Sequence, residues 1–205
     1  KMFVVEEEML TLREQFLLKE LKEFYTDEKI ESILIPLLSQ SASISLRALD
    51  WLVTNHSKKL NILCKSKVHT DKLINIFHSY KLALGHYKRK YFDPFRRRTR
   101  FDILYNDKTY ETTLGQLNFL MWSYRLGILE YAYNHSHEIE KDMNTCTSKY
   151  RKERRENTRN GKKHKRHELS SAPNSLCIVY ETPTPITFDI DDTCLQDHAF
   201  GNVVR

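Results

Sequence analysis

The sequence of 205 residues has little of what marks several specialised classes of protein. Only five glycines and five prolines occur, which argues against a collagen-like or low-complexity chain. The four cysteines, at positions 64, 146, 177 and 194, are scattered and form no Cys-x-x-Cys pair, so we predict reduced, intracellular thiols. The longest uncharged stretch, 32–46, contains Pro36 and five serines, and it is shorter than the roughly 20 apolar residues that span a bilayer.

Residue patterns typical of enzymes are also missing. The chain has no Gly-x-Ser-x-Gly, no P-loop and no His-Glu-x-x-His. His135 and His137 would point to different faces of a helix, with no cysteine at ligand spacing beside them. Asp189, Asp191 and Asp192 could hold a divalent cation, but an acidic tail that pairs with the chain's own basic residues explains them more simply. We therefore predict a binding protein rather than an enzyme, without catalytic residues, metal ligands or cofactor.

Hydrophobic periodicity predicts a mainly helical fold. Apolar residues recur at helical spacing in the segments 6–25, 27–38, 45–59, 70–92, 113–127 and from 128 onward. Thr113 and Gln116 have the spacing of a capping box, and Gly127 is placed to end that helix. Apolar alternation around a polar turn predicts a short β-hairpin at about 101–113. The expected class is α+β, predominantly α-helical, with five or six helices, this hairpin and a strand-like C-terminal tail.

Changes in composition divide the chain into four predicted regions. A polar break separates an N-terminal helical arm, 1–41, from a helical core with the hairpin, 42–148. Residues 149–172 form a basic linker with almost no large apolar side chains, so we expect a solvated helix end or a disordered segment there. The strand-like tail is 173–205. The apolar stripe of the arm can pack on the core or on a partner, and we favour the core.

Positive charge is concentrated in two segments of a chain whose formal net charge is +6. The first has seven basic residues against one aspartate: Lys88, Arg89, Lys90, Arg96, Arg97, Arg98 and Arg100. The second, 149–166, has ten basic residues against two glutamates and ends with Lys162, Lys163, Lys165 and Arg166. Elsewhere acidic residues outnumber basic ones, and such a distribution predicts a polyanionic partner or an acidic protein surface.

Alternatives are open for both segments. In the first, guanidinium groups can bind phosphates while Tyr91, Phe92 and Phe95 stack on bases; otherwise the rings anchor a corner of the core and the arginines face water. The second segment can bind nucleic acid through counterion release, act as a nuclear-localisation signal, dock on an acidic protein, or be solvated only. We favour nucleic acid, either DNA or RNA.

Three segments point to a known family. They are SISLRALDWLVTNHSKK at 43–59, YKRKYFDPFRRRTRFDI at 87–103 and TTLGQLNFLMWSYRLGILEY at 112–131. Together they resemble a family of small uncharacterised proteins of nucleocytoplasmic large DNA viruses, the giant viruses. His56 departs from that pattern, which has an aromatic hydroxyl residue at its place. The resemblance implies a viral origin and a shared fold, but no activity.

With this resemblance, we predict a non-enzymatic basic viral protein that binds nucleic acid through its two Lys/Arg-rich patches. The alternative is a virion structural or minor capsid protein that docks on acidic viral structural proteins. We expect the protein in the virion or inside the infected host cell, in a cytoplasmic virus factory or the nucleus, with no membrane span.

Overall fold

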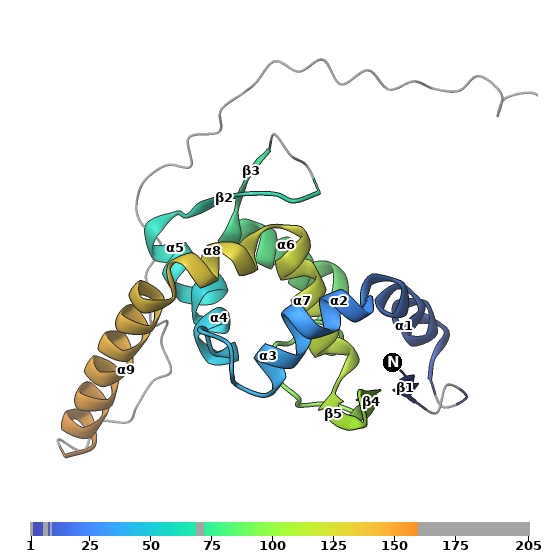
Figure 1. Ribbon diagram of the computed structural model, residues 1–205. Helices are drawn as coiled ribbons and strands as arrows, with labels where there is room; N and C mark the ends of the chain where they lie inside the picture. Colours follow the sequence, from blue (N-terminus) through green and yellow to red (C-terminus); the bar gives the residue numbers. More distant parts are fainter. Residues whose placement is uncertain (1, 6–7, 9, 69–71, 160–205) are drawn as a thin grey trace, which may run out of the picture. The chain divides into compact units, whose positions relative to one another are not determined.

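The computed structural model describes residues 2–5, 8, 10–68 and 72–159, all within the compact unit Lys1–Pro173. The predicted tail, 173–205, and the cluster Lys162, Lys163, Lys165 and Arg166 lie outside the described residues. Helices dominate, which confirms the predicted α+β, mainly helical class. The elements in chain order (Figure 1) are β1 (Met2–Val4), α1 (Leu12–Phe24), α2 (Asp27–Lys29), η2 (Ile30–Leu34), α3 (Ile35–Leu38), α4 (Leu46–Trp51), η3 (Leu52–His56), α5 (Ser57–Leu60), β2 (Leu63–Lys65), β3 (Leu73–Asn75), α6 (Ile76–Tyr87), β4 (Phe101–Tyr105), β5 (Lys108–Thr112), α7 (Leu114–Arg125), α8 (Ile128–Asn134) and α9 (Ser136–Arg159).

The N-terminal segment packs into the common core. Helix α1 begins at Leu12 rather than near residue 6, because Thr11 and Glu14 cap it reciprocally through a capping box. The buried residues Leu17, Leu18, Leu21, Phe24 and Tyr25 join the same hydrophobic cluster as α7. Ahead of α1, strand β1 pairs antiparallel with β4. The sequence pattern did not predict this strand, since three residues are too few to show an alternation.

Two helical runs follow, each with a π-helical turn inside it. The run from Asp27 to Leu38 starts at Thr26, whose side chain accepts the Lys29 N–H. The run from Leu46 to Leu60 starts at Ser45 in the same way. Both were predicted as helices, and both turn their apolar residues into the core.

Antiparallel strands form two small sheets. The predicted hairpin is confirmed as β4 and β5, joined by a turn in which Asn106 and Asp107 have φ of 48° and 58°. Asn and Asp tolerate this left-handed conformation better than other non-glycine residues, which is why they suit a two-residue turn. Strand β1 extends the hairpin into a three-stranded sheet of order β1-β4-β5, and β2 pairs with β3 in the second sheet.

The helix predicted at 70–92 is shorter in the structure and covers only Ile76–Tyr87. Strand β3 precedes it, and Asn75 caps it by accepting the His78 N–H at 2.9 Å. Lys88 ends it with φ of 62°, outside the helical region. Residues after Tyr87 therefore form a turn, and their basic and aromatic side chains do not share helix faces.

The last three helices run in succession from the hairpin. Thr113 caps α7 and Gly127 ends it with φ of 71°, as predicted, but the capping box is only half formed, because the Gln116 side chain bonds Thr112 and the Pro94 carbonyl instead of the Thr113 N–H. Helix α9 is the longest, and its first half buries Ile139 and Met143. Figure 1 shows the second half of α9 continuing beyond the helices on which the first half packs. From residue 151 onward, every side chain of α9 that the structure describes is exposed to solvent.

Candidate polyanion-binding surfaces

The first basic segment is an irregular loop, 88–100, held against the start of α7. The Asp93 N–H donates to the Gly115 carbonyl at 3.2 Å. The Gln116 Nε2 donates to the Pro94 carbonyl at 2.9 Å, and the Asn118 Nδ2 donates to the Tyr91 carbonyl at 2.8 Å. A Cβ at Gly115 would lie 3.1 Å from the Lys90 carbonyl oxygen, so glycine allows the close approach. The loop is thus fixed in place by one face of α7.

The aromatic rings of this loop are used inside the molecule. Phe92 is only 2% exposed, with its ring stacked on Tyr87 and edge-on to Trp122. Tyr91 is half-buried, and the Arg13 guanidinium lies 5.3 Å from its ring centroid. The Arg97 guanidinium lies 4.7 Å from the Phe95 ring in the same way. These contacts favour the interpretation of the rings as anchors of a core corner over that of base-stacking platforms.

Four of the seven cations in the loop form ion pairs with carboxylates of the chain. Lys90 pairs with Glu14 at 2.9 Å, and Arg97 pairs with Asp93 at 3.6 Å. Arg96 and Arg100 share Glu111, at 3.3 and 3.2 Å. The other three, Lys88, Arg89 and Arg98, are exposed and have no carboxylate partner among the described residues. Much of the positive charge of this loop is therefore compensated internally.

The Lys90–Glu14 pair persists over a wide range of pH. Burial favours the neutral form of Glu14, but hydrogen bonds from Lys90 and from Thr11 outweigh it and lower the pKa of Glu14 to about 2. Glu14 is therefore ionised at neutral pH and stays bound to Lys90.

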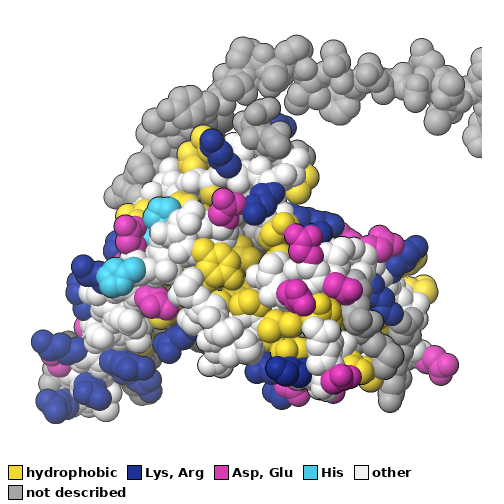
Figure 2. Space-filling model, in the orientation of Figure 1, with side chains coloured by type: hydrophobic (Ala, Val, Ile, Leu, Met, Phe, Trp, Pro, Cys, Tyr) yellow, Lys and Arg dark blue, Asp and Glu magenta, His cyan; other side chains and the backbone are white. Residues whose placement is uncertain are grey.

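The second basic segment begins as the exposed end of α9. Six cations lie on its last eleven residues, Lys149, Arg151, Lys152, Arg154, Arg155 and Arg159, and all are exposed. None of the six has a carboxylate partner within the part of the chain that the structure describes. Figure 2 shows Lys and Arg side chains crowding this end of the helix. In contrast to the 88–100 loop, the positive charge here is available to a partner.

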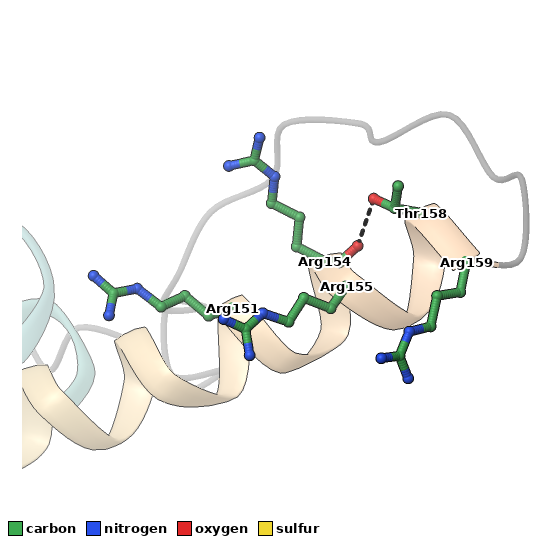
Figure 3. A pocket seen from close by; sticks show the side chains of 5 residues that line it. All are labelled: Arg151, Arg154, Arg155, Thr158 and Arg159. Atoms are coloured by element: carbon green, nitrogen blue, oxygen red, sulfur yellow. Dashed lines mark hydrogen bonds between the residues drawn. The ribbon is translucent and has the colours of Figure 1, made fainter.

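The arginines of α9 lie on one face of the helix. With 3.6 residues per turn, Arg151, Arg154, Arg155 and Arg159 fall within an arc of about 140°. Glu153 and Glu156 lie outside this arc. The four arginines and Thr158 border a shallow hollow of about 380 Å³, and the Thr158 hydroxyl donates to the Arg154 carbonyl at 2.9 Å (Figure 3). We call this surface the arginine face.

A half-buried carboxylate fixes the first half of α9 to the helical run Leu46–Leu60. Asp142, whose side chain is 14% exposed, accepts hydrogen bonds from Trp51 Nε1 at 2.9 Å and Lys59 Nζ at 2.9 Å. His56 Nδ1 lies 3.1 Å from the same carboxylate. Burial raises the pKa of Asp142, but these hydrogen bonds outweigh it and bring the pKa to about 2. The direction in which the arginine face projects is therefore set by a charged anchor at the edge of the core.

Other kinds of site find no support in the described part of the chain. Within it, no group of three or more His, Cys, Asp or Glu side chains is placed to hold a metal ion. His135 stacks on Tyr131, and its Nδ1 lies 3.0 Å from the Tyr131 carbonyl oxygen. Among the same residues, no helix has the length and hydrophobicity to cross a bilayer.

Comparison with known proteins gives a family. A family model described as a family of unknown function, DUF7197, matches residues 4–191. The chain is also 34% identical over 184 residues to uncharacterized protein L507 of Acanthamoeba polyphaga mimivirus, an alignment that covers 80% of this chain and 70% of that protein. No solved structure matches the chain. The predicted resemblance to uncharacterised giant-virus proteins is thus confirmed, and the chain belongs to the DUF7197 family.

Proposed function

We propose that the chain is a non-enzymatic viral protein that binds nucleic acid through the exposed end of α9. The observation that carries the proposal is the set of six exposed cations on 149–159 that have no carboxylate partner among the described residues. Cations that bind phosphates release condensed counterions, and this release drives association. Cations already paired with carboxylates gain less, because an existing ion pair must be broken first.

The chemistry of this helix end favours nucleic acid over an acidic protein. The nine residues from Arg151 to Arg159 include no apolar or aromatic side chain. Stable protein interfaces depend on apolar and aromatic anchors at their centre, where charged residues are depleted. Interfaces with nucleic acid are more polar and much more positively charged. A surface of cations without an apolar anchor therefore fits a phosphate backbone better than it fits a folded protein.

The 88–100 loop has a secondary role in this proposal. Lys88, Arg89 and Arg98 are exposed without a carboxylate partner in the described chain and are able to add phosphate contacts. The loop's remaining cations contribute less, since each would have to exchange Glu14, Asp93 or Glu111 for a phosphate.

The proposal is tested by titrating the full chain with a labelled DNA duplex of about 30 base pairs, which offers several phosphate contacts. Affinity is measured between about 50 and about 200 mM salt. The test variant changes Arg151, Arg155 and Arg159 to Ala, and the matched control changes Arg96, Arg97 and Arg100 to Ala. Both variants remove three positive charges, which are unpaired among the described residues in α9 and paired with Asp93 or Glu111 in the loop.

We expect the wild type to lose affinity steeply with salt. The α9 variant should reduce the slope of log K against log salt by about 2.7, since each lost phosphate contact removes about 0.9. The control should change the slope by less than half of that amount. Binding that is absent at low salt, or that falls equally in both variants, would overturn the proposal. Co-purification with viral particles at fixed stoichiometry, without nucleic-acid binding, would instead favour the virion structural role.

A further inference from the structure

The end of α9 is a helix that packs on no other described element, and its shape restricts which nucleic acid it fits. The residues from 151 to 159 span roughly 13 Å at 1.5 Å per residue. All of them whose side chains the structure describes are exposed, so no other described element fills the space around them. A ligand for this surface must accept a complete helix with its side chains, about 10–12 Å across.

The arginine face is turned away from the surface that packs on the core. Ile139, Met143, Cys146 and Tyr150 mark the packed stripe of α9. At 100° per residue, the centre of the arginine face is rotated about 120° from that stripe. The packed core therefore does not cover the guanidinium groups, and Figure 3 shows them extending from the helix surface.

We infer that this helix end lies in the major groove of B-form duplex DNA, an inference that rests on the proposed function and names its ligand. The B-form major groove is about 12 Å wide and 8.5 Å deep, which admits an α-helix. A helix about 10–12 Å across fits that width, and the exposed end is roughly 13 Å long, so it can lie in the groove while the packed half of α9 stays outside. The four arginines then face both the phosphates and the guanine edges, which accept guanidinium bidentately.

The same surface fits other nucleic acids poorly. The major groove of A-form RNA is deep and too narrow for side chains to read. Single strands are bound mainly by stacking their bases on exposed rings. The residues from 151 to 159 include no ring, and the rings of the 88–100 loop are buried or covered by cations. The geometry thus favours duplex DNA over duplex RNA and over single strands.

A pair of variants tests whether the helix, and not only its charge, is needed. Lys152→Pro removes the hydrogen bond from residue 152 to the Ser148 carbonyl and breaks the helix inside the exposed end. Lys152→Ala removes the same charge and leaves the helix intact. Residues 151–159 pack on nothing among the described residues, but the proline also affects the preceding turn, which contains the packed Tyr150. Circular dichroism and thermal unfolding of the full chain would verify that both variants keep the fold.

The measurement is the affinity of the wild type and of both variants for one duplex DNA, for duplex RNA of the same sequence and for single-stranded DNA, each at about 50 and about 200 mM salt. We expect the wild type and Lys152→Ala to prefer duplex DNA by about tenfold, and Lys152→Pro to lose that preference. Methyl green, which occupies the major groove, should compete, and netropsin, which occupies the minor groove, should not.

Failure of this inference and failure of the proposed function give different results. Equal binding of the Pro and Ala variants, with a steep salt dependence in both, would overturn groove binding and leave nucleic-acid binding standing. Preference for duplex RNA or for single strands would also overturn it. Loss of binding to all three nucleic acids in the wild type would remove the proposed function itself.

Discussion

The 88–100 loop and the end of α9 have similar densities of basic residues but differ in how the fold uses them. In the loop, four of seven cations pair with Glu14, Asp93 or Glu111, and the neighbouring rings fill a corner of the core. In α9, all six cations are exposed without a carboxylate partner among the described residues. The difference shows that the number of Lys and Arg residues in a segment does not give the charge it presents to a partner. That charge depends on which carboxylates the fold brings beside it.

The largest expected effect on stability comes from changing Asp142, which fixes α9 and with it the arginine face. Asp142→Asn removes the charge that Trp51, Lys59 and His56 share. We expect a loss of about 2–3 kcal/mol in the free energy of unfolding at pH 7, measured by urea denaturation, because the charge is lost and the amide nitrogen cannot accept one of the hydrogen bonds. Glu153→Gln, on the exposed end of the same helix, should change the stability by less than about 0.5 kcal/mol. Equal effects of the two changes would contradict the division of α9 into an anchored and a free half.

Because of the Asp142 carboxylate, we expect the free energy of unfolding to depend on pH. The pKa of Asp142 in the folded protein is lowered to about 2, below the value of about 4 for an unfolded chain. Its stabilising contribution is therefore present above about pH 4 and is lost as the pH falls from about 4 through about 2. The stability difference between wild type and Asp142→Asn should shrink over that window. The Glu14 carboxylate titrates in both proteins, so it cancels in the comparison.

A glycine substitution tests whether the 88–100 loop is held rigidly on α7. Gly115→Ala places a Cβ 3.1 Å from the Lys90 carbonyl oxygen, and the loop cannot retreat without straining its three hydrogen bonds to α7. We expect a loss of about 1–2 kcal/mol in thermal or chemical unfolding. In the control, Gly85→Ala, the added Cβ has no atom within 4 Å outside its own stretch of helix, and we expect a gain of about 0.5–1 kcal/mol. A stabilising Gly115→Ala would mean that the loop moves freely.

The smallest expected effect comes from freeing paired cations in the 88–100 loop, which would make the loop more like the end of α9. Glu111→Gln frees Arg96 and Arg100 from their shared carboxylate. We expect the affinity for a DNA duplex at low salt to rise about three- to fivefold, because two more cations become available to phosphates. Glu23→Gln makes the same change of charge at an exposed position without an ion-pair partner in the described chain, and its effect should be smaller. Identical gains would show that only net charge matters, and not local pairing.

Local patterns were sufficient for much of the fold. The helices at 27–38 and 45–59, the hairpin at 101–113 and the cap at Thr113 follow from spacing and turn chemistry within a few residues. The prediction failed where a neighbour distant in sequence decides the conformation. Strand β1 forms because it pairs with the edge of β4. The helix predicted at 70–92 begins later than predicted, because β3, at its start, pairs with β2.

The sequence by itself determined the helical class, the hairpin, the family resemblance and the positions of the two basic segments, since each depends on residues close together in the chain. Only the tertiary structure decided which cations are paired, since Lys90 meets Glu14 across 76 positions and Lys59 meets Asp142 across 83. Electrostatic pairing acts over a few ångströms of space, not of sequence. For that reason the exposed face of α9 emerges as the candidate binding surface only once the chain is folded.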